Sequence, residues 1–410
     1  QHVFYVNTLT PPICGQFQEM HPLSQRGDCR LANGRFLPYN EPIPQRNGWN
    51  NEPMKQYPYI YSREKPRRRI LPFFLWLAGI LLTLVTVGIL SNAVVNHQLM
   101  LVSLRVTVQK LPPELENWSI LHISDLKGAT FGEHQREIKK LLENKAFSSV
   151  VFTGDMVGKD GDIEPFLDLV KLLPTDVPKI MIPGDRDPLT TLSVAHDSLS
   201  VYAPWVERLQ AAGVTLLDEP LAIARNGKTI WFVPEFMYAL DLDSYQSSWQ
   251  LMLDNLPKDD GVLTADQSAQ KRLGEYQLGI IQRLKELTAS MTPKDVQIAL
   301  THIPLTPEYM STMVSWTDKS QGFTLRQASL ILAGHYNAGG WRLPGGGAIY
   351  TEPFGWFPED KDLTGLNYMG GVPQYISPGL NGDPPLSFLP GRFMNPPAMT
   401  LITLTGHITK

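Results

Sequence analysis

The chain has 410 residues, which allows two or three domains at about 100–200 residues per domain. Hydrophobic residues make up 43% and charged residues 19% of the sequence, so the composition excludes wholesale disorder. The net charge of −4 argues against a nucleic-acid-binding protein, and only two cysteines exclude a disulfide-dense scaffold.

Residues 1–69 differ in composition from the rest of the chain. They hold ten Lys or Arg and five Asp or Glu, a net charge of +5, which leaves −9 for the remainder. Pro, Asn, Gln and Tyr are frequent and aliphatic residues are few, so this arm cannot bury much apolar surface by itself. We expect it to be ordered by a partner, with other subunits of a membrane complex contacting residues 1–100. Because Gln1 is not an initiator residue, we expect that the natural start of the chain was removed or precedes it.

The arm also contains both cysteines, Cys14 and Cys29, with His21 between them. Such a group is either a metal clip or two ordinary thiols. The spacing fits no common zinc pattern, which favours two ordinary thiols.

An uncharged segment follows the arm. Ile70–Val95 reads ILPFFLWLAGILLTLVTVGILSNAVV, and no Asp, Glu, Lys or Arg occurs between Arg69 and Arg105. About 20 mainly apolar residues span a bilayer, so these 26 residues predict a single transmembrane helix over 70–95. The alternatives are a buried core helix and a signal peptide. Few soluble helices are apolar all round for this length, and the segment is too long and too far from residue 1 for a signal peptide.

The flanks of this helix predict its orientation. Five basic residues stand at positions 63, 65, 67, 68 and 69, whereas the next basic residue after the helix is Arg105. The positive-inside rule therefore predicts a single-pass protein of the cell membrane, with a cytoplasmic N-terminus and an extracytoplasmic C-terminal domain.

From residue 101 onward the sequence alternates between short apolar runs and helical patterns, which predicts an α/β domain over 101–410. Helices are predicted over 133–144, 165–173 and 271–289. Strands are predicted over 119–124, 149–153, 179–182, 229–233, 296–301, 330–333 and 399–404.

Polar residues follow five of these strands. Asp125, Asp155 and Asp185 come after the first three, and His302 and His335 come after two later ones. Each of these residues alone is typical of a helix cap or a turn. Ligands in α/β sheets bind at the carboxyl ends of the strands, so the joint occurrence of carboxylates and imidazoles there favours a metal site.

These residues give the sequence a resemblance to the calcineurin-like metallophosphoesterases. The family order Asp-x-His, Gly-Asp, Gly-Asn-His-Asp/Glu, His and Gly-His-x-His is similar to HISDLKG (122–128), Gly154-Asp155, Gly184-Asp185-Arg186-Asp187, His302 and Gly334-His335-Tyr336-Asn337. The segment HISDLKG and the tail over 365–404 resemble the membrane-anchored bacterial branch most. The resemblance implies a four-layer α-β-β-α sandwich of two mixed sheets flanked by helices.

The resemblance also implies two metal sites, and this sequence departs from the first. The family holds that ion with the Asp and His of the first motif, the Asp of Gly-Asp and the last His. Here Asp125 and Asp155 match, but Lys127 and Asn337 stand where the two imidazoles belong. A lysine ammonium repels a divalent cation and pairs with carboxylates, so Lys127 is a candidate substitute for the missing ion.

The second site that the resemblance implies is better preserved. Asp155, His302 and His335 match, and Asp185 replaces an Asn with another oxygen ligand. Two imidazoles and two carboxylates suit Zn²⁺, Mn²⁺ or Fe²⁺. The sequence leaves two outcomes open, one divalent ion or none.

The family's general acid is also replaced, because Arg186 stands at the position of the His in Gly-Asn-His. Arginine binds phosphate well but cannot exchange a proton near neutral pH. Loss of one proton-transfer residue typically costs about 10²–10⁴ in rate.

These losses favour a pseudoenzyme, a structural or binding subunit of a membrane assembly. The first alternative is a single-metal phosphohydrolase that acts on phosphodiester or pyrophosphate bonds, including those of lipid-linked substrates. The second is a phosphate or nucleotide sensor without turnover. Arg392 either supports the site edge or pairs with a carboxylate, and we interpret Glu235, His134 and His196 as surface or structural residues.

Overall fold

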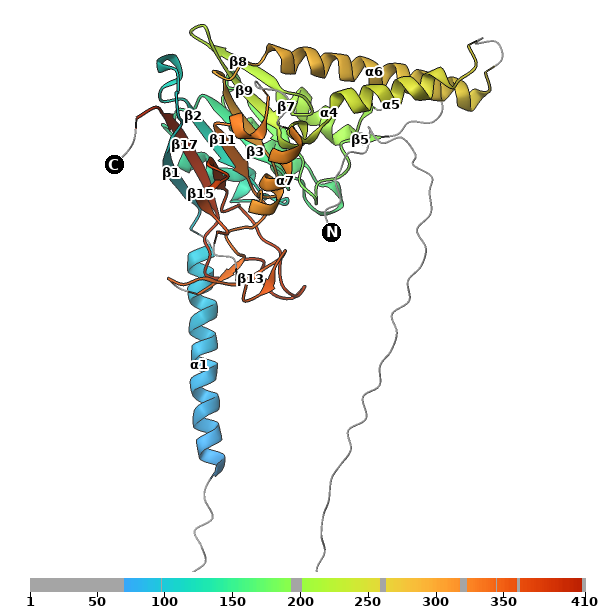
Figure 1. Ribbon diagram of the computed structural model, residues 1–410. Helices are drawn as coiled ribbons and strands as arrows, with labels where there is room; N and C mark the ends of the chain where they lie inside the picture. The colour runs from blue at the N-terminus through green and yellow to red at the C-terminus, as the bar shows by residue number, and fades with distance from the viewer. Residues whose placement is uncertain are drawn as a thin grey trace, which may run out of the picture. The chain divides into compact units, whose positions relative to one another are not determined.

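The computed structural model describes residues 70–96, 98–192, 201–258, 263–317, 323–343, 345–359 and 362–407 (Figure 1). The predictions for the arm over 1–69, its cysteines and its partners, and the prediction for His196, lie outside these residues. The described chain divides into two compact units between Thr83 and Leu84, within the first helix.

The first helix, α1, is Ile70–Asn96, one residue longer than the predicted segment. Its residues from Leu71 onward have a mean hydropathy of 2.5, and the apolar window is not buried by the rest of the chain. Among the described helices it alone is long and apolar enough to cross a membrane.

Two six-stranded sheets follow. In spatial order, the first contains β1 (Met100–Thr107), β17 (Ala398–Thr405), β2 (Ser119–Ile123), β3 (Ser149–Thr153), β4 (Lys179–Ile182) and β7 (Val214–Leu216). The second contains β15 (Gly365–Met369), β16 (Val372–Ile376), β11 (Leu330–Ala333), β10 (Val296–Leu300), β9 (Lys228–Pro234) and β8 (Leu221–Arg225).

Both sheets are mixed. Strands β2, β3, β4 and β7 are parallel, as are β9, β10, β11 and β16, whereas β17 is antiparallel to β2. The outer strands β8 and β15 pair in antiparallel fashion with their neighbours. The parallel strands point their carboxyl ends to one edge, which is where the site forms.

The two sheets pack face to face over a shared apolar core. Ile120, Val151 and Ile180 of the first sheet meet Phe232 and Ile298 of the second in one buried cluster. The alternate residues of the same strands point outward, as Val150 and Phe152 of β3 do. Because these central strands are buried on both faces, most of their residues are apolar.

Helices cover the outer face of each sheet, which completes the four layers that the sequence predicts. The first sheet is covered by α2 (Arg136–Leu142), α3 (Glu164–Lys171) and α4 (Pro204–Ala211). The second is covered by α6 (Ala265–Ser290), α7 (Pro307–Thr317) and the 3-10 helix η4 (Glu235–Ala239). Helix α5 (Leu242–Asp254) pairs with α6 in a hairpin that extends from the domain (Figure 1).

Smaller elements complete the fold. They are a three-stranded sheet of β12 (Trp341–Arg342), β13 (Ala348–Thr351) and β14 (Gly355–Trp356), the pair β5 (Thr191–Leu192) and β6 (Val201–Tyr202), and the 3-10 helices η1 (Pro113–Leu115), η2 (Glu133–Gln135), η3 (Lys159–Gly161) and η6 (Leu325–Gln327).

The fold corrects two predicted helices. The helix predicted over 133–144 is interrupted, because His134 and Gln135 have φ of 48° and 58°, and regular α-helix begins at Arg136. The helix predicted over 271–289 begins earlier, at Ala265, where the side chains of Thr264 and Gln267 form a reciprocal capping box.

Candidate metal centre

The site lies where strands of both sheets end. Asp125 and Asp155 follow β2 and β3, and Asp185 comes three residues after β4. From the other sheet, His302 follows β10 and His335 follows β11. All five residues that the sequence predicts at strand ends are therefore presented at one edge.

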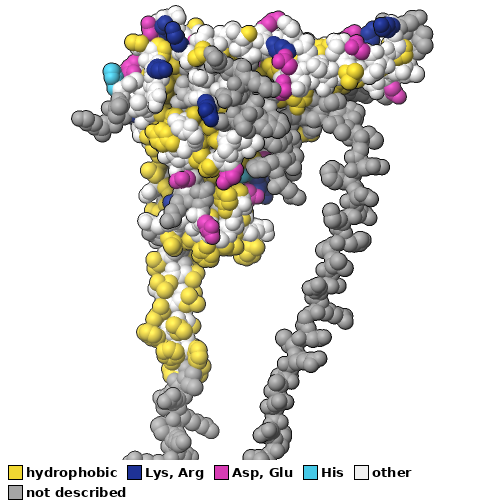
Figure 2. Space-filling view, in the orientation of Figure 1, with side chains coloured by type: hydrophobic (Ala, Val, Ile, Leu, Met, Phe, Trp, Pro, Cys, Tyr) yellow, Lys and Arg dark blue, Asp and Glu magenta, His cyan; other side chains and the backbone are white. Residues whose placement is uncertain are grey.

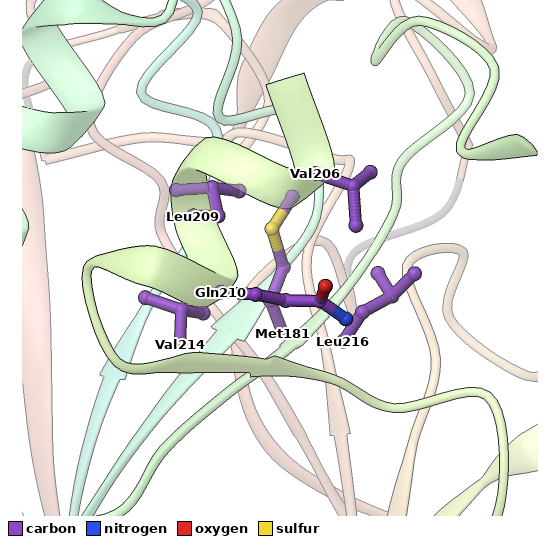
Figure 3. Close-up of a pocket in the computed structure, with 6 residues that line it drawn as sticks. All are labelled: Met181, Val206, Leu209, Gln210, Val214 and Leu216. Carbon is purple, nitrogen blue, oxygen red and sulfur yellow. The ribbon is translucent and has the colours of Figure 1, made fainter. Parts of the chain in front are cut away.

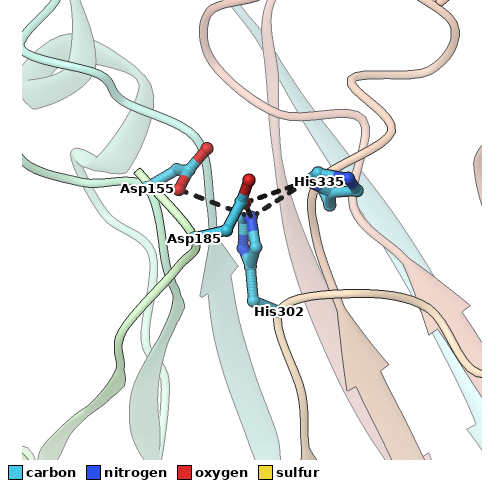
Figure 4. A group of neighbouring side chains, drawn as sticks. All are labelled: Asp155, Asp185, His302 and His335. Atoms are coloured by element: carbon cyan, nitrogen blue, oxygen red, sulfur yellow. Dashed lines mark hydrogen bonds and ion pairs between the residues drawn. The ribbon is translucent and has the colours of Figure 1, made fainter. Parts of the chain in front are cut away.

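Four of these side chains form a compact group. One ligand atom from each of Asp155, Asp185, His302 and His335 lies within 4.8 Å of the others (Figure 4). The His302 Nε2 is 2.9 Å from the Asp185 Oδ1 and 3.4 Å from the Asp155 Oδ1. The His335 Nδ1 is 3.2 Å from the Asp185 Oδ1 and 3.2 Å from the His302 Nε2. Four N and O donors converging on one point fit a single divalent ion.

The orientation of His302 supports this fit. Its Nδ1 is 2.6 Å from the carbonyl oxygen of Thr153, a group that only accepts, so Nδ1 carries the hydrogen. Nε2, which faces the other three side chains, is therefore the nitrogen available to an ion. An imidazole fixed through its second nitrogen in this way is typical of metal ligands.

The charged side chains of this group shift one another's pKa values. Burial lowers the pKa of His302, but the Asp155 and Asp185 carboxylates raise it by more, to well above the ordinary value. Burial raises the pKa of Asp155, whereas His302 and Lys127 lower it by more, so this carboxyl has a pKa well below its usual range. The acids are thus ionised, and protons compete with metal for the imidazole nitrogen.

Asp187 holds the loop under the metal group. Its buried carboxylate accepts backbone N–H bonds from Asp155, Met156, Val157 and Gly184, at 2.8–2.9 Å. Burial and the neighbouring charge of Asp155 raise the pKa of Asp187 to about 6. The sequence placed Asp187 in the third motif without a role, and the structure makes it the residue that positions Asp155.

Glycines allow the loops to approach this closely. A Cβ on Gly154, where φ is 83°, would lie 2.5 Å from the Gly184 nitrogen and 2.7 Å from the His302 Nδ1. A Cβ on Gly184 would lie 2.2 Å from the Asp155 Oδ1. Both positions therefore exclude any side chain.

The first metal position of the family pattern does not fit an ion here. The Lys127 ammonium points inward, 3.2 Å from the Asp155 Oδ2 and 3.6 Å from the Asp125 Oδ1, and it also donates to the Asp383 Oδ2. Burial alone lowers the pKa of Lys127, but the three carboxylates raise it above its usual value. A permanently charged ammonium thus lies between the two acids that would hold the ion.

Asn337 lies in the same half of the site, where its side chain binds the backbone rather than facing an ion. Its Nδ2 donates to the His335 carbonyl oxygen at 3.0 Å, and its buried Oδ1 accepts no hydrogen bond. Asp125 accepts from the His335 backbone N–H at 3.1 Å. Both residues therefore support the loop that carries His335.

Arg186 lies at the open side of the site. Its backbone N–H donates to the Asp155 Oδ1 at 3.0 Å, while its guanidinium reaches the Glu352 Oε1 at 3.2 Å and the Asp383 Oδ1 at 2.9 Å. Asp383 consequently bridges the two cations Lys127 and Arg186. The sequence assigned no role to either acid, because each lies more than 160 residues from Arg186 and only the fold brings them together.

Site residues share an uncommon backbone conformation. Asp125, Lys127, Asp155, His335 and Asn337 all have positive φ, between 48° and 71°. Such conformations are costly for residues other than glycine and gather at functional sites. The fold maintains them through the hydrogen bonds described above.

Other predicted candidates take structural roles. Arg392 is buried and donates to four backbone carbonyls, those of Pro378, Asn381, Asn395 and Pro396, so it supports the loop at the site edge. Glu235 is partly buried and accepts from the Tyr309 hydroxyl, whereas His134 is exposed and contacts Asp168 at 2.8 Å.

The small hollow beneath α4 holds no ligand site. Between α4 and strands β4 and β7, six packed side chains leave no room for a water molecule (Figure 3). They are Met181, Val206, Leu209, Gln210, Val214 and Leu216. This is part of the core beneath α4.

One of three comparisons with known proteins identifies the family of this chain. The sequence model of the calcineurin-like phosphoesterase family matches residues 119–337, from the first residue of β2 to Asn337. A solved structure of a phosphopantetheinyl hydrolase from Mycobacterium tuberculosis is similar over 64% of this chain and 89% of that one, with 14% sequence identity and a TM-score of 0.30. No curated protein matches the chain.

Proposed function

The chain belongs to the calcineurin-like phosphoesterase family, and we propose that it is a membrane-tethered member that has lost two-metal hydrolysis. In this proposal it binds one metal ion and a phosphorylated ligand, and it acts as a subunit of a membrane assembly. The observation that carries the proposal is the Lys127 ammonium between Asp125 and Asp155.

The chemistry of the two cations supports loss of turnover. In two-metal phosphoesterases one ion generates hydroxide and both stabilise the oxygens of the transferring phosphoryl group. An ammonium supplies one positive charge, but it neither coordinates water nor lowers the pKa of a bound water as a divalent ion does. The positive charge of Arg186 favours binding of a phosphate, but its guanidinium cannot donate a proton to a leaving group near neutral pH.

The same groups favour binding. A divalent ion held by Asp155, Asp185, His302 and His335 would supply Lewis-acid attraction for a phosphate oxygen. Lys127 and Arg186 present two further cations, and Asp383 now lies between them as a phosphate oxygen would. The site is therefore arranged for an anion that displaces Asp383.

The membrane part of the proposal is supported by α1 and by the composition of the arm. We propose that α1 anchors the protein in the cell membrane as a single pass, with the N-terminus cytoplasmic and the domain outside. The polar arm over 1–69, with few aliphatic residues, would then contact partner subunits.

Metal content and turnover of the full chain in lipid nanodiscs test the proposal. After incubation with Mn²⁺ or Zn²⁺ and removal of excess metal, we expect one equivalent by mass spectrometry, lost in His302→Ala and kept in the exposed control His134→Ala. Bis-p-nitrophenyl phosphate and pyrophosphate should bind without turnover above background. Two equivalents, or metal-dependent hydrolysis, would contradict the loss of two-metal chemistry.

The assembly role has its own test. The full chain and a chain that starts at residue 70 are purified from the native membrane under the same mild conditions, and their masses are compared. The full chain should elute with stoichiometric partners that the shorter chain lacks. If both chains elute as monomers, the subunit role is contradicted, while the metal result is unaffected.

The intact four-ligand group favours one alternative, a single-metal phosphohydrolase. It predicts hydrolysis of phosphodiester or pyrophosphate bonds, including those of lipid-linked substrates, with Arg186 orienting the phosphate. Activity unchanged in both His302→Ala and His335→Ala would exclude it.

A further inference from the structure

The exposed Phe and Trp side chains of the domain gather on one part of it. Outside α1, every strongly exposed Phe or Trp among the described residues lies on β12–β14 and its flanks or on the loop 382–393. We name this surface the aromatic rim. It consists of Leu343, Phe354, Trp356, Phe357, Leu386 and Phe388. Large exposed apolar side chains that gather on neighbouring segments in this way are typical of an interaction site.

The rim is a firm structure. The Trp341 ring packs between the rings of Trp356 and Phe393, with centroids 5.9 and 5.2 Å away, and Tyr350 packs on Trp356 at 5.1 Å. The Trp341 Nε1 also donates to the Pro390 carbonyl oxygen at 2.8 Å, which ties the small sheet to the loop. These contacts hold the Trp356 ring in place and join the small sheet to the loop 382–393.

Phe357 shows how strongly the fold favours exposure here. Its side chain is 75% exposed although its backbone has φ of 54°, a region that bulky residues rarely adopt. In water, neither the exposure nor the strain has a benefit. Both are consistent with a partner that receives the ring.

The last turns of α1 contact the base of the rim. A methyl group on Gly88 would lie 3.9 Å from the Phe393 Cζ, and Asn92 Oδ1 accepts from the Met394 N–H at 2.8 Å. Asn96 Nδ2 donates to the Arg392 carbonyl oxygen at 2.7 Å. Hydrophobic surface also gathers at the foot of the domain, where it meets this end of α1 (Figure 2).

These contacts set the depth of the rim. Gly88 lies eight residues before the end of α1, about 12 Å along the helix at 1.5 Å per residue. The apolar run of α1 continues through Leu90, with Ile89 and Leu90 both exposed. If α1 spans a bilayer, a segment packed level with Gly88 therefore lies at the boundary between acyl chains and headgroups.

We propose that the aromatic rim docks into the headgroup–acyl boundary of the bilayer that α1 spans, an inference that rests on the membrane anchoring proposed above. Aromatic rings prefer that boundary, where an apolar ring is buried beside polar headgroups. Residues of the rim itself carry no charge, so docking is hydrophobic and independent of anionic lipid.

Docking would also fix the metal centre relative to the membrane. Glu352, in the turn that leads to Phe354, pairs with Arg186 at the open side of the site. Tyr336, beside the ligand His335, packs on Phe354 with ring centroids 5.1 Å apart. The open side of the site and the rim are thus one connected surface.

Environment-sensitive labels on the full chain test this. In a Cys14→Ser, Cys29→Ser background, a nitrobenzoxadiazole label is placed at Phe357→Cys or Phe388→Cys, and at Leu251→Cys on α5 as control. The three side chains are similarly exposed, at 75%, 79% and 63%. In neutral phosphatidylcholine vesicles, we expect iodide to quench the two rim labels at least about threefold less than the control, because a docked probe lies 5–10 Å below the surface.

Equal iodide quenching at all three positions would overturn the docking proposal. An alkaline wash of the same vesicles distinguishes failed docking from a failed anchor. If the wash removes the chain, α1 does not span the bilayer, and the anchoring and the docking proposals both fail. The unlabelled chain gives a second readout. Lipids brominated near the headgroup should quench its tryptophan emission less after Trp356→Phe, and an unchanged degree of quenching would also contradict docking.

Discussion

Replacing Lys127 by methionine is the sharpest test of how the site works. The substitution keeps most of the side-chain volume and removes the ammonium that lies 3.2 Å from Asp155 and 3.6 Å from Asp125. At an effective dielectric constant of about 20, each such pair contributes about 5 kcal/mol before desolvation is subtracted. Leaving buried carboxylates unpaired costs about 3–5 kcal/mol of folding stability. For a domain of this size that lowers the melting temperature by about 5–8 °C.

The assay is the melting temperature of the full chain in detergent, with and without Mn²⁺. A divalent ion can now enter between the two acids, so Mn²⁺ should stabilise Lys127→Met more than the wild type, by about 2.7 kcal/mol at 100 times its Kd. Lys179→Met is the matched control, because the buried Lys179 donates to the carbonyls of Pro174 and Val177 and Mn²⁺ has no site there. If Lys127→Met melts within about 1 °C of the wild type, or gains no more from Mn²⁺ than the control does, the ammonium does not replace an ion.

Three further predictions follow from the same geometry. The double variant Lys127→His, Asn337→His should restore the first ligand set and bind two equivalents of metal by mass spectrometry, and one equivalent would show that the surrounding loops no longer admit an ion. Asp383→Asn should bind inorganic phosphate at least about tenfold more tightly by calorimetry, because the carboxylate that now bridges two cations loses its charge, whereas equal or weaker binding would contradict that role. Burial raises the pKa of Glu235 to about 7, against the opposing hydrogen bond from Tyr309. The contribution of Glu235 to the free energy of unfolding is therefore complete below about pH 4.5 and is lost as the pH rises through 7. The loss amounts to at most roughly 3 kcal/mol. In denaturant unfolding, the wild type should lose this stability between pH 5 and pH 8, whereas Glu235→Gln should not.

The central strands could be predicted because burial on both faces leaves a clear pattern. The strands over β3, β4 and β11 are continuous apolar runs, and their predicted bounds are confirmed. The edge strand β15 reads GLNYM, with alternate residues exposed and two glycines next to it, and the apolar pattern alone did not predict it. The small sheet β12–β14 has strands of two to four residues, too short for any periodicity.

Part of the candidate site could likewise be predicted from the sequence, and part could not. Residues at strand ends could be placed together, because parallel strands bring their ends to one edge. The inward direction of Lys127 could not be predicted, since it depends on Asp383, which lies 256 residues away in a tail whose acids the sequence gives no role. The bonds of Asp187 to four backbone N–H groups likewise depend on how two loops meet, which local sequence does not determine.

The ammonium at the first metal position changes what the site needs from its surroundings. A bound ion exchanges with the medium, so its occupancy follows supply, competition and chelation. Lys127 is synthesised with the chain, and its charge is present once per molecule whatever the metal concentration. In the function proposed above, scarcity of metal would empty only the half of the site formed by Asp155, Asp185, His302 and His335, while the other half would keep its positive charge.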